Sequence, residues 1–141
     1  MRTIATAVLL GLLAQGCAQE TGRLDADQEA RLAAQGIARR GNNLVFRHTH
    51  GAGARWEMRR ASIVVTRGTI LIHRNGEVQF LFEPTSRRFC EVHRDHERVR
   101  ISSGSGMSAE AWSFEPPDDP DGWTADIRSA IRATKRRAHS P

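Results

Sequence analysis

The spacing of the apolar residues changes twice along this chain and divides it into a helical segment, a β-rich region and a terminal helix. Over residues 25–40 the apolar positions recur loosely at helical spacing, with Asp25 placed to cap the first turn and Gly41 placed to end the helix. From residue 44 onward apolar and polar residues alternate, which is typical of strands with one buried face. The pattern predicts a mostly β domain of the α+β class, with a short N-terminal helix.

A hairpin gives the clearest local signal in the β-rich region. Asn75-Gly76 stands between two apolar stretches, and Asn-Gly supplies the positive φ angles that a two-residue type I′ turn requires. Such a loop places Arg74 opposite Glu77 and Leu71 opposite Phe80. With the other alternating and β-branched runs between residues 44 and 114, we expect about seven antiparallel strands.

The last element is an amphipathic helix, expected over residues 121–137. One face is apolar at the spacing of a helix and carries Trp123, Ile127, Ala130 and Ile131, with Thr134 continuing it. Basic residues gather toward the end of the helix, where the helix dipole favours cations. Because a helix with one apolar face must bury it, we expect this helix to pack against the sheet.

This order of elements resembles the pleckstrin-homology-like superfold, particularly its small bacterial members. The resemblance covers residues 44–137 and includes a Trp in the first turn of the final helix, here Trp123. It implies a small, partly open β-barrel, with the C-terminal helix plugging one open end and Trp123 packing into the barrel. It also implies a binding module rather than an enzyme, since members of this superfold mostly bind lipids, peptides or proteins.

The first residues have the order of a secretory signal peptide. Arg2 supplies a charge, residues 4–13 are apolar, and small residues follow. The apolar run is shorter than the about 20 residues of a comfortable membrane span. Residues 13–17, Leu-Ala-Gln-Gly-Cys, resemble the lipobox of bacterial lipoproteins, which implies cleavage before Cys17 and a diacylglycerol on its thiol. The alternative is cleavage after Ala18, which leaves a soluble periplasmic or secreted protein.

These boundaries divide the chain into four parts. We expect a signal peptide at residues 1–16, an anchor and spacer helix at 17–43, the barrel domain at 44–137 and a disordered tail at 138–141. The expected location is a bacterial membrane, with the domain facing the periplasm or the exterior. We favour the anchored form over simple secretion because a cysteine at the exit of a signal peptide seldom has another role.

The charge of the chain is modestly basic, with a formal net charge of +5 and Lys135 as its only lysine. A basic surface attracts anionic partners, and five arginines form the densest basic stretch. We predict that this stretch is the contact surface for an envelope protein or an anionic surface: Arg87, Arg88, Arg94, Arg98 and Arg100. The alternative is a solvated face on which neighbouring carboxylates balance the arginines. Arginines also follow Arg128 on the last helix, where they could touch an anionic membrane.

Two groups of histidines invite a metal interpretation. Cys90, His93 and His96 have a C-x-x-H-x-x-H spacing, but on a strand Cys90 and His93 point to opposite faces. We therefore expect no metal and no cofactor, with Cys90 as a small buried residue. A metal-binding protein or metal-dependent enzyme using these three residues remains the alternative. His48 and His50 share a face and are more simply two exposed polar residues ahead of a glycine turn.

No catalytic signature is found in the sequence. It contains no G-x-S-x-G and no H-E-x-x-H, and its glycine-rich stretch at residues 102–106 lies between strands. Aromatic residues do not interleave with the arginines as they do in proteins that bind single-stranded nucleic acid. The sequence predicts a noncatalytic, exported binding or structural module of the bacterial envelope, with no nucleic-acid partner.

Overall fold

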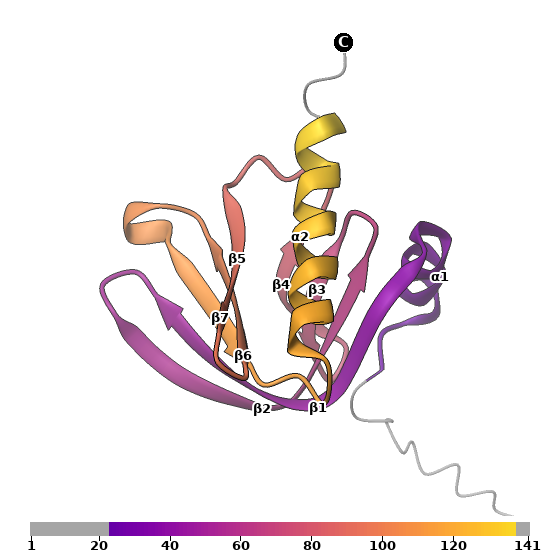
Figure 1. Cartoon of the computed structure of the whole chain (residues 1–141). Coiled ribbons are helices and arrows are strands. Elements are labelled where there is room, and N and C mark those ends of the chain that lie inside the picture. Colours follow the sequence, from indigo (N-terminus) through magenta and orange to yellow (C-terminus); the bar gives the residue numbers. More distant parts are fainter. Residues whose placement is uncertain (1–22, 138–141) are drawn as a thin grey trace, which may run out of the picture.

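A computed structural model describes residues 23–137 of the chain. Seven strands form one antiparallel sheet in the order β4-β3-β2-β1-β7-β6-β5, preceded by helix α1 and followed by helix α2 (Figure 1). A single turn of 3-10 helix, Gly106–Ser108, precedes β7. The bounds are α1 Ala26–Gln35, β1 Ile37–His50, β2 Ala54–Thr66, β3 Ile70–Arg74, β4 Glu77–Phe82, β5 Cys90–Asp95, β6 Arg98–Ser103, β7 Glu110–Phe114 and α2 Pro120–Arg137.

The sheet curls into a half-barrel around α2, and its concave face forms the main core (Figure 1). Phenylalanines from three strands, Phe46, Phe80 and Phe114, meet the apolar side of α2 there. Trp123 in the first turn of α2 is 2% exposed, and its ring lies edge-on to Phe114 with 5.6 Å between centroids. The structure thus confirms the expected seven-stranded, mostly β fold with a C-terminal helix, and it confirms that Trp123 is buried inside it.

The N-terminal helix is shorter than its sequence pattern predicts. It ends at Gln35 rather than at residue 40, and Gly36 follows it with a φ of 78°. Residues from Ile37 onward belong to β1 and pair with β2 from Thr66 backwards. The expected boundary between spacer and domain at residues 43 and 44 is therefore wrong, because sheet pairing with β2 overrides the weak helical pattern here.

Helix α1 packs on the outer face of the sheet. Leu24 and Leu32 form a second, smaller apolar cluster with Val64 of β2 and Leu71 of β3. The first turn is held by a capping box, in which Asp25 accepts a hydrogen bond from the backbone N–H of Gln28 at 2.7 Å. The helix is thus part of the folded domain rather than a detached spacer.

The β3–β4 hairpin has the expected turn but a shifted register. Asn75 and Gly76 have φ angles of 53° and 77°, and Arg74 lies opposite Glu77 as predicted. Further along, Leu71 lies opposite Leu81 rather than Phe80, because the pairing shifts between Ile72 and His73. The shift places Phe80 opposite Ile72, and both side chains then face the main core.

The predicted signal peptide at 1–16, the lipid-modified Cys17 and the tail at 138–141 lie outside the described residues.

Candidate functional site

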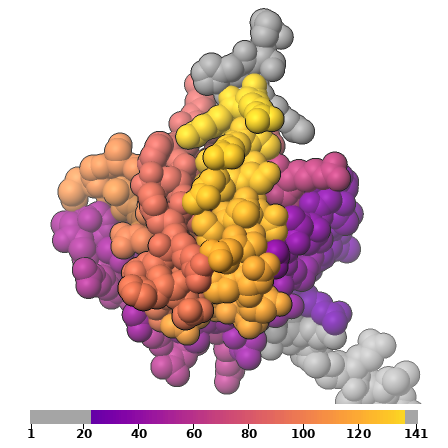
Figure 2. All heavy atoms as spheres, in the orientation of Figure 1, coloured from indigo at the N-terminus to yellow at the C-terminus, as the bar shows by residue number. Residues whose placement is uncertain are grey.

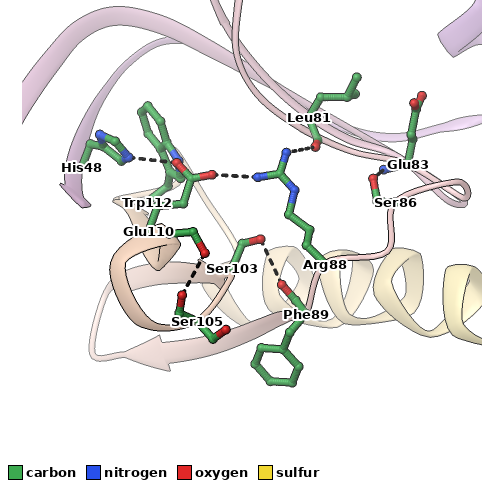
Figure 3. A network of polar contacts seen from close by, with 11 residues as sticks. His48, Leu81, Glu83, Ser86, Arg88, Phe89, Ser103, Ser105, Glu110 and Trp112 are labelled. Carbon is green, nitrogen blue, oxygen red and sulfur yellow. Dashed lines mark hydrogen bonds and ion pairs between the residues drawn. The ribbon is translucent and has the colours of Figure 1, made fainter. Parts of the chain in front are cut away.

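Arg88, one of the five predicted contact arginines, ties β4 to β7 across the open side of the half-barrel. Its guanidinium donates to the backbone carbonyl of Leu81 at 3.2 Å and to Oε1 of Glu110 at 2.9 Å (Figure 3). It also lies over the ring of Phe80, 5.4 Å from the centroid. Since β4 and β7 are not neighbours in the sheet, these contacts hold two separate strands together. Arg88 is therefore a structural clamp.

Glu110 is the centre of the same polar cluster. Its Oε2 accepts a hydrogen bond from Nε1 of Trp112 at 3.2 Å and lies 3.1 Å from Nε2 of His48. The His48 ring stacks on Trp112 with 3.8 Å between centroids. Burial lowers the pKa of His48, although the Glu110 carboxylate opposes that shift. The carboxylate charge is thus balanced by Arg88. The expectation that His48 is exposed is wrong, because stacking on Trp112 buries its ring to 5% exposure.

Arg94 and Arg98 are also paired with carboxylates. Arg94 makes an ion pair with Asp121 at the start of α2 and donates to the backbone carbonyl of His96 at 2.8 Å. Arg98 makes an ion pair with Glu115 at 3.1 Å. These arginines hold the ends of β5 and β6 against neighbouring segments, which matches the alternative of a charge-balanced face.

The five predicted arginines do not form one surface. Arg94 lies on the same side of β5 as the buried Cys90 and Val92, whereas Arg100 lies on the outer side of β6. Arg87 is exposed in the loop after β4. Within residues 23–137, neither Arg87 nor Arg100 has an ion pair or a side-chain hydrogen bond. Arg100 is therefore the predicted residue best placed for an external contact on the sheet.

The structure adds a second arginine to Arg100. On the outer face, Arg47 of β1 lies opposite Ser113 of β7, and Ser113 lies opposite Arg100 of β6. Adjacent strands are about 4.8 Å apart, so the two arginine Cα atoms are about 10 Å apart with a small serine between them. Arg47 is also exposed and has no ion pair among the described residues. We call Arg47, Ser113 and Arg100 the outer arginine row.

A shallow hollow of about 210 Å³ lies beside the outer arginine row. Its floor is a second cross-strand row of small residues, in which Thr49 and Ser102 flank Ala111. Arg100 forms part of its wall, and the exposed ring of Phe89 lies at its edge. The hydroxyls of Thr49 and Ser102 can donate or accept hydrogen bonds. Glu91 and Glu110 also line the hollow, so this part of the face combines one arginine and two carboxylates with a polar floor.

Two of the acidic residues near this row have contacts of their own. Glu57, which lies opposite Arg47 on β2, accepts from Nε of Arg59 at 2.8 Å. Glu91 lies 3.1 Å from Nε2 of His93. The guanidiniums of Arg47 and Arg100 are therefore available to an external anion. Each presents a planar fork of donors that matches the two oxygens of a carboxylate or phosphate.

Cys90, His93 and His96 do not converge. Cys90 is 1% exposed in the main core, and burial raises the pKa of its thiol to about 12. His93 is exposed on the opposite face of β5, and His96 lies in the turn that follows, with a φ of 54°. No three His, Cys, Asp or Glu residues within 23–137 are grouped so that they could hold a metal ion.

Sequence reasoning missed Arg47, Ser113 and Ser102. Strict alternation along each strand marks Arg47 and Ser113 as outward-facing, and this signal is present in the sequence. What joins them is the pairing of β1 with β7, whose paired residues are 60 or more positions apart in the chain. Local pattern alone does not specify that pairing.

No protein-family model matches this chain, and no curated protein matches it. None of the helices within residues 23–137 is long and apolar enough to cross a membrane.

Proposed function

We propose that the protein is a noncatalytic binding module of the bacterial envelope that contacts carboxylate or phosphate groups through the outer arginine row. The observation that carries the proposal is the pair of exposed, unpaired guanidiniums, Arg47 and Arg100, on either side of Ser113. An anion above Ser113 is within reach of both forks and of a hydroxyl donor.

Export and a lipid anchor at Cys17 are part of the same proposal. They rest on the signal-like first residues and on the resemblance of residues 13–17 to a lipobox. The half-barrel serves as a rigid scaffold for the contact surface, because strands position side chains more precisely than loops do.

The experiment is crosslinking in intact cells followed by recovery of the partner. We expect the double variant Arg47→Glu/Arg100→Glu to lose the crosslinked partner while remaining folded. The matched control is Arg31→Glu/Arg87→Glu, which changes the net charge equally at exposed arginines on α1 and in the loop after β4. Equal loss in both variants would show only a general charge effect, and retention in both would refute the proposed surface.

The anchor is tested separately by the intact mass of the mature protein from the membrane fraction. A chain that begins at Cys17 and carries a diacylglyceryl group supports the anchored form. A soluble chain that begins at Gln19 refutes the anchor and leaves the contact surface to be judged by the crosslinking result.

A further inference from the structure

The first half of β2 is an unpaired strand edge. On one side β2 pairs with β1 down to Ala54, but on its other side it pairs with β3 only over residues 62–65. Residues 54–60 therefore have no partner strand on that side within residues 23–137, and we call them the β2 edge. In Figure 2 the tip of this hairpin lies at the left margin of the molecule, away from α2. A free edge offers backbone N–H and C=O groups to an added strand.

The backbone of the β2 edge directs its polar groups outward at every second residue. In the hairpin turn the carbonyl of His50 accepts a hydrogen bond from the N–H of Gly53 at 3.2 Å, so the backbone of His50 faces β2. Because these directions alternate along paired strands, the backbone groups of Trp56 face β1. Those of Arg55 and Glu57 then face the open side. An added strand can therefore form its hydrogen bonds at these two residues.

Trp56 is the large apolar side chain on the β2 edge that stays open to solvent. It is 49% exposed, although its ring is held edge-on against His48 with 4.3 Å between centroids. The indole is thus fixed in position on one side and uncovered on the other. Tryptophan side chains of this kind are frequent anchors of protein–protein interfaces.

The charges on the β2 edge are complementary to a second copy of the same edge. Arg55 and Glu57 are exposed, and their opposite charges stand two positions apart on one strand face. When two copies pair antiparallel with Trp56 opposite Trp56, Arg55 of each copy lies opposite Glu57 of the other, and twofold symmetry makes this contact twice. Glu57 accepts from Arg59 through Oε1 at 2.8 Å. Its Oε2 has no hydrogen bond among the described residues and can accept from the second copy.

Other registers of the same pairing lose these contacts. With Arg55 or Glu57 at the centre, each lies opposite its own copy and like charges face each other. With Met58 at the centre, Trp56 lies opposite Arg60, whose φ of 56° departs from strand conformation. A shift by one residue places the two Trp56 side chains on opposite faces. Charges on an edge strand usually discourage pairing, but here they favour one register and a second copy as the occupant.

We propose that two copies of this chain pair through their β2 edges, antiparallel and centred on Trp56, so that the two sheets become continuous. The contact consists of hydrogen bonds and ion pairs at Arg55 and Glu57 and of the two facing indoles. It is smaller than a standard protein–protein interface, so we expect a dissociation constant of about 10–100 µM. The proposal is independent of the outer arginine row, since neither Arg47 nor Arg100 takes part.

The test is sedimentation equilibrium of the mature protein over about 1–500 µM. Arg55→Glu should weaken the dimer at least about tenfold, because two attractive pairs become two repulsive ones, and Glu57→Arg should do the same. The combined variant Arg55→Glu/Glu57→Arg should restore the dimer, because opposite charges face each other again. The matched control is Arg31→Glu at an exposed position on α1, which changes the net charge as Arg55→Glu does and should leave the dimer unchanged.

A cysteine at the centre of the pairing tests the register directly. In a pair without hydrogen bonds between its two residues, the Cα atoms of the two copies of Trp56 are about 4.5 Å apart, which a disulfide can bridge. The two copies of Arg55 are about 8 Å apart, which a disulfide cannot bridge. Under mild oxidation, mass spectrometry should therefore find residue 56 linked to itself in Trp56→Cys, but should not find residue 55 linked to itself in Arg55→Cys.

The opposite results would overturn the proposal. A monomer at every concentration refutes the pairing of two copies. A dimer that survives Arg55→Glu, or one that the combined variant does not restore, refutes the contact between Arg55 and Glu57. Equal weakening by Arg31→Glu would show a general charge effect and would also refute it. None of these results bears on the phosphate or carboxylate contact of the outer arginine row.

Discussion

Replacement of Arg88 by alanine should destabilise the domain, whereas the same change at Arg100 should not. Arg88→Ala removes a hydrogen bond to the Leu81 carbonyl, an ion pair with Glu110 and the contact with the Phe80 ring. The Glu110 side chain is only 16% exposed and keeps its negative charge without its cation. Hydrogen bonds to charged groups contribute about 1.5–3 kcal/mol when buried, and exposed ion pairs less than about 1 kcal/mol.

Because the Arg88 side chain is itself 44% exposed, we expect Arg88→Ala to lower the free energy of unfolding by about 2 kcal/mol. Arg100→Ala removes no ion pair or side-chain hydrogen bond within the described residues and should stay within about 0.5 kcal/mol of the wild type. Urea unfolding at pH 7, monitored by fluorescence, measures the change in the free energy of unfolding for both variants. In a double-mutant cycle with Glu110→Gln, the combined variant should cost less than the sum of the single variants.

The interpretation of Arg88 as a clamp would be refuted by a loss below about 0.5 kcal/mol. A similar loss at Arg100 would refute the separation of the basic residues into structural and available ones. Either result would mean that the five predicted arginines are equivalent surface charges.

Three further predictions follow from the buried groups. Trp123→Ala should lower the free energy of unfolding by about 3–5 kcal/mol, because the indole of Trp123 on α2 is buried against Phe114. Urea unfolding measures this loss, and a value below about 1 kcal/mol would contradict the placement of the helix. The Cys90 thiol, with its pKa raised to about 12 by burial, should resist iodoacetamide at pH 8 until urea unfolds the chain, and labelling of the folded protein would contradict its burial. Burial, with a smaller contribution from Arg40, lowers the pKa of His73, so the unfolded chain takes up a proton that the folded one does not. Stability should therefore fall as pH drops below about 6.5, and the fall between pH 7 and pH 5 should be smaller in His73→Leu; equal slopes in the two proteins would contradict it.

Much of the fold follows from local rules that act on neighbouring residues. The Asn75-Gly76 turn, the inward side of β6 with Val99 and Ile101, and the buried face of α2 all depend on spacing within one or two elements. Those features were predictable because the spacing of apolar residues and the residue types in the turn specify them directly.

Features that depend on distant pairing were not predictable in the same way. Residues 37–40 belong to the predicted helix of residues 25–40, but they join the sheet because β2 offers a partner strand. The shift in the β3–β4 register occurs because it directs Phe80 into the core. The pairing of Arg94 with Asp121 likewise needs the position of α2, which no local pattern specifies.

The candidate site shows the same division. The density of arginines along the sequence identified Arg100 as part of a basic stretch. It could not distinguish Arg100 from the three arginines whose carboxylate partners come from other elements, which are Arg88, Arg94 and Arg98. Arg47 was missed because it joins Arg100 only through the order β1-β7-β6. A pattern of charges along one segment thus predicts a basic face, while three-dimensional pairing decides which charges remain available.

The central claim is that Arg47 and Arg100 together bind an anionic oxygen group above Ser113. The most direct measurement is a titration of the isotope-labelled mature protein with inorganic phosphate, in which NMR records the backbone amide resonances. We expect saturable shifts centred on Ser113 and Ser102 that disappear in Arg47→Gln/Arg100→Gln and persist in Arg31→Gln/Arg87→Gln. Shifts that spread over all exposed arginines, or that survive in the first variant, would contradict the claim.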